Sequence, residues 1–166
     1  MIISAKWIDW FQPERFAAKV LASVLGGNMS SRLFQNIRTK QGLCYYISAH
    51  HSAWSEMGTF MIRAWMNKDK FEFWLEKIRE EIESLSKNGI TKEEFDKTIW
   101  YLQWQIQMWI ETSDEMSDFI WGQYIIYNKI ESLEDILQSY KNLTLDDVNK
   151  LIWMLNLDNC YTFYIE

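Results

Sequence analysis

Arg38 and Tyr45 are two residues of this sequence whose chemistry suits holding a peptide. They stand seven residues apart, with Gly42-Leu43 just before the tyrosine. An arginine offers planar, permanently charged donors to a carbonyl or carboxylate, and a tyrosine hydroxyl can donate to a developing oxyanion. A surface cation beside a half-buried ring is the alternative interpretation. From the residues alone that alternative is the more common arrangement, because most arginines are exposed.

A zinc centre needs neutral imidazoles, usually a carboxylate, and a glutamate to take the proton from bound water. The only histidines are the adjacent pair His50 and His51. Neighbouring residues of a strand point to opposite faces of a sheet, so both rings cannot easily reach one ion. Glu56 is near in sequence but lies across an expected turn. We therefore predict no metal site and no catalytic residue on this chain.

The stretch from residue 26 to residue 32 contains glycines and serines that can be compared with nucleophile and phosphate motifs. A nucleophile elbow requires Gly-x-Ser-x-Gly between a strand and a helix, and a phosphate loop requires Gly-Lys-Ser/Thr after a strand. Neither pattern is present. We expect Gly26-Gly27 to end one helix, Asn28 to accept a left-handed conformation, and Ser30 or Ser31 to cap the next helix.

Hydrophobic periodicity predicts how the chain is organised around these residues. Thr91 and Glu94 form a sequence-level capping box, and Ser113 is a candidate cap for the following helix. Strands are expected at about 2–11, 43–54, 59–65 and 160–165. Helices are expected at about 13–25, 30–38, 69–88, 91–111 and 113–127, then from 132 and from 144 through 152. This order predicts a single α+β domain over 1–166, with one mostly antiparallel sheet covered by helices on one face.

The composition excludes several classes of protein. The 166 residues are 48% hydrophobic and 24% charged, which excludes a disordered chain. A net charge of −6 disfavours nucleic acid as a partner, and no apolar run is long enough for a membrane span. The N-terminus is typical of a strand, so any export signal would lie outside this chain. Cys44 and Cys160 are interpreted as two buried thiols, and the compartment stays undetermined.

The aromatic content is the unusual feature of the composition, with ten Trp, eight Tyr and nine Phe. Trp100, Trp104 and Trp109 fall in one expected helix and cover more than one of its faces. A helix that is apolar on several sides needs several partners. Two interpretations stay open: part of this surface meets another domain or subunit, or the domain has an unusually thick core.

Several segments, taken in order, resemble one family. The densest is LGGNMSSRLFQNIRTKQGLCYYISA, starting at Leu25. It is followed by the Gly58–Phe60 strand, by EKIREEIESLSKNGITKEEFDKTIWYL and by TLDDVNKL. Together they resemble the non-catalytic domain of the pitrilysin/insulinase-type zinc metallopeptidases, which include the mitochondrial processing peptidases. The chain departs from that pattern at Asn28, where a third glycine is common.

The resemblance implies one α+β domain of a clamshell whose two halves enclose a chamber. It implies that a partner domain or subunit carries zinc and the inverted motif His-x-x-Glu-His, which this chain lacks. It also implies that Arg38 and Tyr45 contact the peptide substrate beside that metal. A chain of this length is then expected to be a fragment, or one domain, of a longer peptidase.

Two functions from different classes follow as hypotheses. In the first, the chain is the non-catalytic domain of a zinc metalloendopeptidase and lines its peptide-binding chamber. In the second, it is a non-enzymatic scaffold or interaction domain of a degenerate peptidase-like protein. A zinc motif in the neighbouring sequence or subunit would favour the first.

Overall fold

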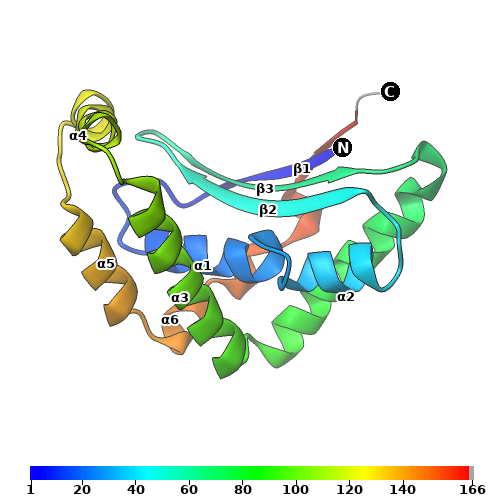
Figure 1. Cartoon of the computed structure of the whole chain (residues 1–166). Helices are drawn as coiled ribbons and strands as arrows, with labels where there is room; N and C mark the ends of the chain where they lie inside the picture. The colour runs from blue at the N-terminus through cyan, green and yellow to red at the C-terminus, as the bar shows by residue number, and fades with distance from the viewer. Residues whose placement is uncertain (165–166) are drawn as a thin grey trace.

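Four antiparallel strands form one sheet in the order β2-β3-β1-β4. The computed structural model describes residues 1–164. The helices lie against one face of the sheet and leave the other face uncovered (Figure 1). This arrangement confirms the predicted α+β class with helices on one side. The strands are β1 (Ile2–Trp7), β2 (Tyr46–Ala53), β3 (Gly58–Trp65) and β4 (Tyr161–Phe163).

Helical segments connect the strands. The long ones are α1 (Arg15–Gly26), α2 (Phe71–Asn88), α3 (Lys92–Trp109), α4 (Ser113–Tyr127) and α5 (Leu133–Asn142); the short ones are α6 (Leu145–Asn149), a π-helix η1 (Phe34–Thr39), and 3₁₀ turns η2 (Lys68–Lys70), η3 (Ile152–Met154) and η4 (Leu157–Asn159). The predicted hairpin and the predicted long helices are therefore confirmed to within a few residues.

The core lies between the sheet and helices α1, α2 and α3. Alternate residues of each strand face the helices, and the register aligns Ile3 of β1 with Ile62 of β3, and Ile62 with Ala49 of β2. These three side chains are almost fully buried. Because side chains alternate along a strand, the same register places Ser48, Arg63 and their neighbours on the uncovered face.

Helix α1 approaches strand β2 closely at Gly26. A Cβ atom at this position would lie 2.2 Å from the backbone nitrogen of Ala49. A side chain there would collide with backbone, which cannot move aside easily, so glycine is required for packing. Gly27 is likewise in the right-handed helical region, with φ −77°. The glycine pair therefore allows close packing, and the predicted left-handed turn at Asn28 is wrong.

The polar residues after this pair also behave differently from the prediction. Asn28, not a serine, organises the turn: its Oδ1 accepts from the backbone N–H of Ser30 at 2.8 Å. The Ser30 hydroxyl donates to the same oxygen, and the Ser31 hydroxyl donates to the Asn28 carbonyl. Neither serine caps the next helix, because an asparagine two residues upstream can satisfy the turn earlier.

Helix starts follow the sequence closely where a capping box is present. Thr91 and Glu94 satisfy each other's backbone amides at the start of α3, as predicted. At α4 the cap is Thr112 with Glu115, so the assignment of Ser113 as the cap is wrong by one residue. Threonine at 112 is favoured because it places the glutamate at the third helical position.

The C-terminal strand is shorter than expected. β4 covers only Tyr161–Phe163 and pairs with β1 through Ile2↔Phe163. The predicted strand began at Cys160, which lies just outside β4, and its last residue, Ile165, lies outside the described residues. Cys44 is buried and Cys160 half-buried, and both are free thiols.

Helix α4 stands apart from the core beside the tip of the β2–β3 hairpin (Figure 1), where the Tyr127 hydroxyl donates to the Ala53 carbonyl at 3.1 Å. Its only buried residue is Gln123. Exposed apolar side chains cover much of it: Met116, Ile120, Trp121, Tyr124, Ile125 and Ile126. The three tryptophans of α3 are exposed as well. A thick core therefore does not account for the aromatic surplus.

Candidate functional site

Arg38 lies in the last turn of the π-helix η1. Such wide turns are rare and frequently occur at functional sites. The Arg38 guanidinium carbon is 4.4 Å from the centre of the Phe34 ring, which holds the side chain by a cation–π contact. Within residues 1–164, no carboxylate pairs with it. The guanidinium is thus supported by a ring and keeps its hydrogen-bond donors for another group.

The connection from Arg38 to the sheet depends on Gly42. This glycine has φ +61°, in the left-handed region that other residues avoid. Its backbone N–H donates to the Arg38 carbonyl at 3.1 Å, and the Leu43 N–H donates to the Ile37 carbonyl at 3.2 Å. These two bonds fold the chain back immediately after the helix. The Gly-Leu pair before the tyrosine therefore has a structural reason.

Tyr45 is fixed by its backbone and free at its side chain. Its N–H donates to the Trp65 carbonyl at 2.8 Å, which extends the β2–β3 pairing by one residue. The side chain is 74% exposed, and its hydroxyl has no hydrogen-bond partner in the described part of the chain. Arg38 and Tyr45 consequently lie at the same end of the domain, where β2 begins, with their polar groups available.

Two further aromatic residues accompany Tyr45, and the sequence analysis did not select them. Trp65 is 71% exposed, and the Tyr46 ring meets it edge-on at 6.4 Å. Only the strand register, which pairs Tyr46 with Trp65, brings them together. A correct hairpin alignment would have been the signal that reveals this pair.

Burial and the charge of Arg38 act on the pKa of Cys44 in opposite directions. Burial raises the pKa of the neighbouring Cys44 thiol to about 11, and the charge of Arg38 opposes that rise. The thiol therefore stays protonated at neutral pH and has little nucleophilic character. The chemistry available here is hydrogen bonding to a peptide, through a guanidinium and a phenol.

The histidines occupy different environments. His51 is buried and its Nε2 lies 2.8 Å from the Ile8 carbonyl, which can only accept, so Nε2 carries the proton. His50, on the other face of β2, is half-buried. Burial lowers the pKa of both rings. Residues 1–164 contain no group of three or more His, Cys, Asp or Glu side chains placed to hold a metal ion, so they do not fit zinc.

The N-terminal part of this chain matches a known protein family. Residues 4–102, more than half of the chain, match the family described as "Peptidase M16 inactive domain". The chain belongs to this M16 family. The chain is 32% identical over 149 residues to an uncharacterized zinc protease of Rickettsia felis, covering 89% of this chain and 36% of that protein. An uncharacterized zinc protease of Streptomyces coelicolor is 30% identical to this chain over 134 residues. That match covers 81% of this chain and 29% of the Streptomyces protein.

Solved structures agree with the M16 assignment. The M16 peptidase inactive domain from Pseudomonas fluorescens superposes with a TM-score of 0.82 at 25% identity, over 96% of this chain and 38% of that one. The inactive peptidase domain of a putative zinc protease from Bordetella parapertussis gives a TM-score of 0.79 at 16% identity, over 96% and 87% of the two chains. At that identity, the second match shows the fold alone.

The chain spans about a third of the length of the zinc protease relatives it matches. It is therefore similar to one domain of those proteins. Within residues 1–164, no helix combines the length and the apolar character needed to cross a bilayer. The match to an inactive-domain family agrees with the lack of a His-x-x-Glu-His motif in the sequence.

Proposed function

We propose that this chain is the non-catalytic domain of a zinc metalloendopeptidase, that it lines the peptide-binding chamber, and that Arg38 and Tyr45 contact the substrate. The observation that carries the proposal is that both side chains lie at the start of β2 and have no polar partner among the described residues. A guanidinium and a phenol with free donors can both bind the carbonyl or carboxylate oxygens of a peptide.

The two residues have complementary roles in this proposal. The Arg38 guanidinium, held against Phe34, donates to a peptide carbonyl or carboxylate in a fixed plane. The Tyr45 hydroxyl, on a backbone pinned to β3, donates to the oxygen that becomes negative during cleavage. Zinc, its ligands and the general base belong to a partner domain or subunit, so no proton-transfer step is assigned to this chain.

The same proposal includes the partner's position. Residues 1–166 form one domain of a longer or multi-subunit peptidase, and the zinc-bearing part contacts the apolar side of α4. Supporting this, α4 exposes large apolar side chains such as Trp121 (58%) and Ile125 (71%), whereas soluble monomers rarely keep such residues adjacent.

The experiment is a comparison of matched variants in the assembled enzyme. Arg38→Ala and Tyr45→Phe should each lower kcat/KM for a peptide by about a hundredfold, the typical cost of one transition-state donor. Arg79→Ala and Tyr161→Phe are the controls, because Arg79 forms an exposed pair with Asp158 and Tyr161 is 72% exposed on the opposite edge strand. Unchanged kinetics in both test variants would overturn the proposal.

A second candidate function is favoured by the α4 surface alone. The chain would then be a scaffold or interaction domain whose peptidase partner is absent or degenerate. This hypothesis predicts that the α4 side binds a protein that lacks His-x-x-Glu-His, and that Arg38 and Tyr45 variants leave binding unchanged. Sequencing the neighbouring chain or subunit discriminates between the two functions.

A further inference from the structure

A separate cavity lies at the other end of the domain, between α1, α3, α5 and the last residues of β2. Its volume is about 670 Å³, within the usual range for small-molecule sites. His51, which lines the cavity, stands six positions after Tyr45 along extended chain, a distance of about 20 Å. The cavity is therefore distinct from the proposed peptide contacts.

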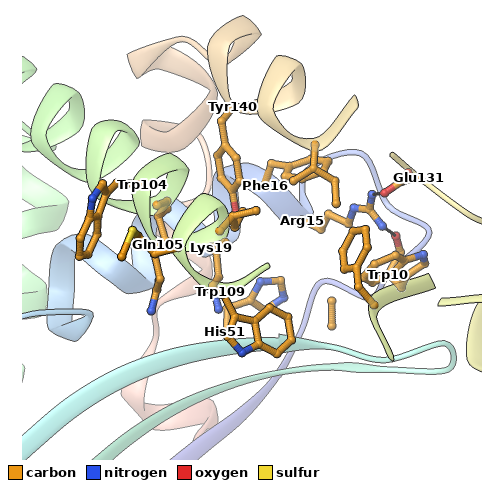
Figure 2. Close-up of a pocket in the computed structure, with 16 residues that line it drawn as sticks. Trp10, Arg15, Phe16, Lys19, His51, Trp104, Gln105, Trp109, Glu131 and Tyr140 are labelled. Atoms are coloured by element: carbon orange, nitrogen blue, oxygen red, sulfur yellow. Dashed lines mark hydrogen bonds and ion pairs between the residues drawn. The ribbon is translucent and has the colours of Figure 1, made fainter. Parts of the chain in front are cut away.

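The walls of the cavity are mostly apolar and include several aromatic rings. Phe16 and Tyr140 meet edge-on, with ring centres 5.2 Å apart, on one side. Trp104 and Trp109 of α3 line it as well and are 46% and 67% exposed. Figure 2 shows Tyr140 and Trp109 on opposite sides of the space, with Trp104 farther out along α3. Such walls favour a flat or branched apolar group over a chain of polar atoms.

Two cations reach this space, and only one of them already has partners. Arg15 donates to the Trp10 carbonyl at 3.0 Å and forms an ion pair with Glu131. Its guanidinium carbon also lies 4.0 Å from the Trp10 ring centre. Glu131 is further engaged by Lys129 at 3.1 Å. The arginine and the carboxylate of the cavity are therefore satisfied by each other and by their neighbours.

Lys19 is the cation left without a partner. It projects from α1 into the cavity, with Gln105 and His51 among its neighbours there (Figure 2). Among the described residues no hydrogen bond or ion pair holds its ammonium group. The side chain is half-buried, and burial lowers its pKa. A half-buried ammonium group without an anion is costly, and a bound carboxylate would remove that cost.

We propose that this cavity binds an organic carboxylate with an aromatic or branched apolar body, its carboxylate on the Lys19 ammonium group and its body against Trp104, Trp109 and Phe16. An amine would be repelled by Lys19. A polyphosphate would leave charges facing the aromatic walls. Two sources supply the required chemistry: a free aromatic acid, or the C-terminal residue of a peptide. The site acts independently of Arg38 and Tyr45.

Isothermal titration calorimetry of the purified protein tests this site. The probes are 2-naphthylacetate and its neutral amide, and N-acetyl-Gly-Phe with a free or an amidated C-terminus. A free carboxylate should bind at least tenfold more tightly than the matching amide, because a charge-assisted hydrogen bond is lost in the amide. If only naphthylacetate binds tightly, the ligand is a free acid. If only the peptide acid binds tightly, the ligand is the C-terminal residue of a peptide. Either result supports the proposal.

Lys19→Met keeps the apolar stem and removes the charge. It should weaken carboxylate binding about tenfold or more and leave amide binding unchanged. Lys19→Arg should keep the preference for the carboxylate. Lys141→Met, at an exposed lysine of α5, is the matched control. Trp109→Ala, at an exposed ring, should weaken acid and amide equally. The proposal fails if acid and amide bind alike, if none of the four probes binds at millimolar concentration, or if Lys19→Met changes nothing.

Discussion

Arg32 binds both carboxylate oxygens of Glu94 through two nitrogens of its guanidinium: Nε lies 2.6 Å from one oxygen, and Nη2 lies 2.7 Å from the other. The Arg32 Nη2 also donates to the Gly89 carbonyl at 3.0 Å. Glu94 also accepts from Thr91 in the capping box of α3. One ion pair thus fixes the segment before η1 to the start of α3.

Removing the charge of Glu94 should destabilise the domain. Glu94→Gln keeps a capping acceptor but loses the bidentate ion pair, so unfolding free energy should fall by about 1–3 kcal/mol at pH 7. Urea denaturation measures the change. Glu93→Gln is the control: Glu93 forms an exposed pair with Lys97, so this substitution should cost about 0–1 kcal/mol.

The same pair gives a pH dependence with a defined sign. Burial alone would raise the pKa of Glu94, but hydrogen bonds from Arg32 and Thr91 outweigh it and the pKa is lowered. A lowered pKa in the folded state gives stability that is present above the ordinary value of 4.5 and is lost as pH falls through the folded value. The difference between wild type and Glu94→Gln should shrink at pH 3. An equal difference at both pH values would contradict this account.

Two glycines should respond to alanine in opposite directions. Gly26→Ala forces a Cβ against the Ala49 backbone, so it should lower unfolding free energy by about 1–3 kcal/mol. Gly122 lies inside α4 with nothing within 4 Å of an added Cβ, so Gly122→Ala should raise the unfolding free energy by about 0.5–1 kcal/mol. Thermal and urea unfolding would measure the direction of each change. Two shifts in the same direction would refute the close approach of α1 to β2.

The α4 surface should matter for association and not for folding. Replacing Trp121 and Ile125 by glutamine should change unfolding free energy by less than about 0.5 kcal/mol, because both are exposed. Binding to the zinc-bearing partner should weaken roughly tenfold or more if these residues form the centre of the interface. Trp153→Gln, at a ring that is 78% exposed on η3, is the control. Loss of stability without loss of partner binding would argue against a docking surface.

Cys44 should react slowly with alkylating reagents. With a pKa of about 11, its rate of reaction with iodoacetamide should rise roughly tenfold per pH unit between pH 7 and 10. A Cys160→Ser background isolates the Cys44 signal, which mass spectrometry can follow. A plateau near pH 8.5, the value of an ordinary thiol, would show that burial does not control this cysteine.

Local sequence rules predicted the elements whose causes are local. The capping residues predicted the start of α3, and the alternation of apolar and polar residues predicted the β2–β3 hairpin. The wrong caps at Asn28, Ser30, Ser31 and Ser113 are local errors of one to three residues, whereas the features that the rules missed altogether depend on contacts between distant segments. Helix α1 ends at Gly26, as predicted, but the close approach of Gly26 to Ala49 of β2 could not be inferred from any rule about helix ends. The role of Arg38 and Tyr45 came from resemblance, and the aromatic neighbour Trp65 needed the strand register. The cavity around Lys19 needed four elements in place.

The π-helix η1 makes the direction of Arg38 sensitive to chain length. Its backbone hydrogen bonds span five residues, as in the bond from the Lys40 N–H to the Gln35 carbonyl at 3.0 Å, where an α-helix would span four. Deleting one residue between Phe34 and Ile37 would let the segment close as an ordinary α-helix, with Arg38 in nearly the same direction. Inserting one residue would instead require a still wider turn and would rotate Arg38 away from the start of β2.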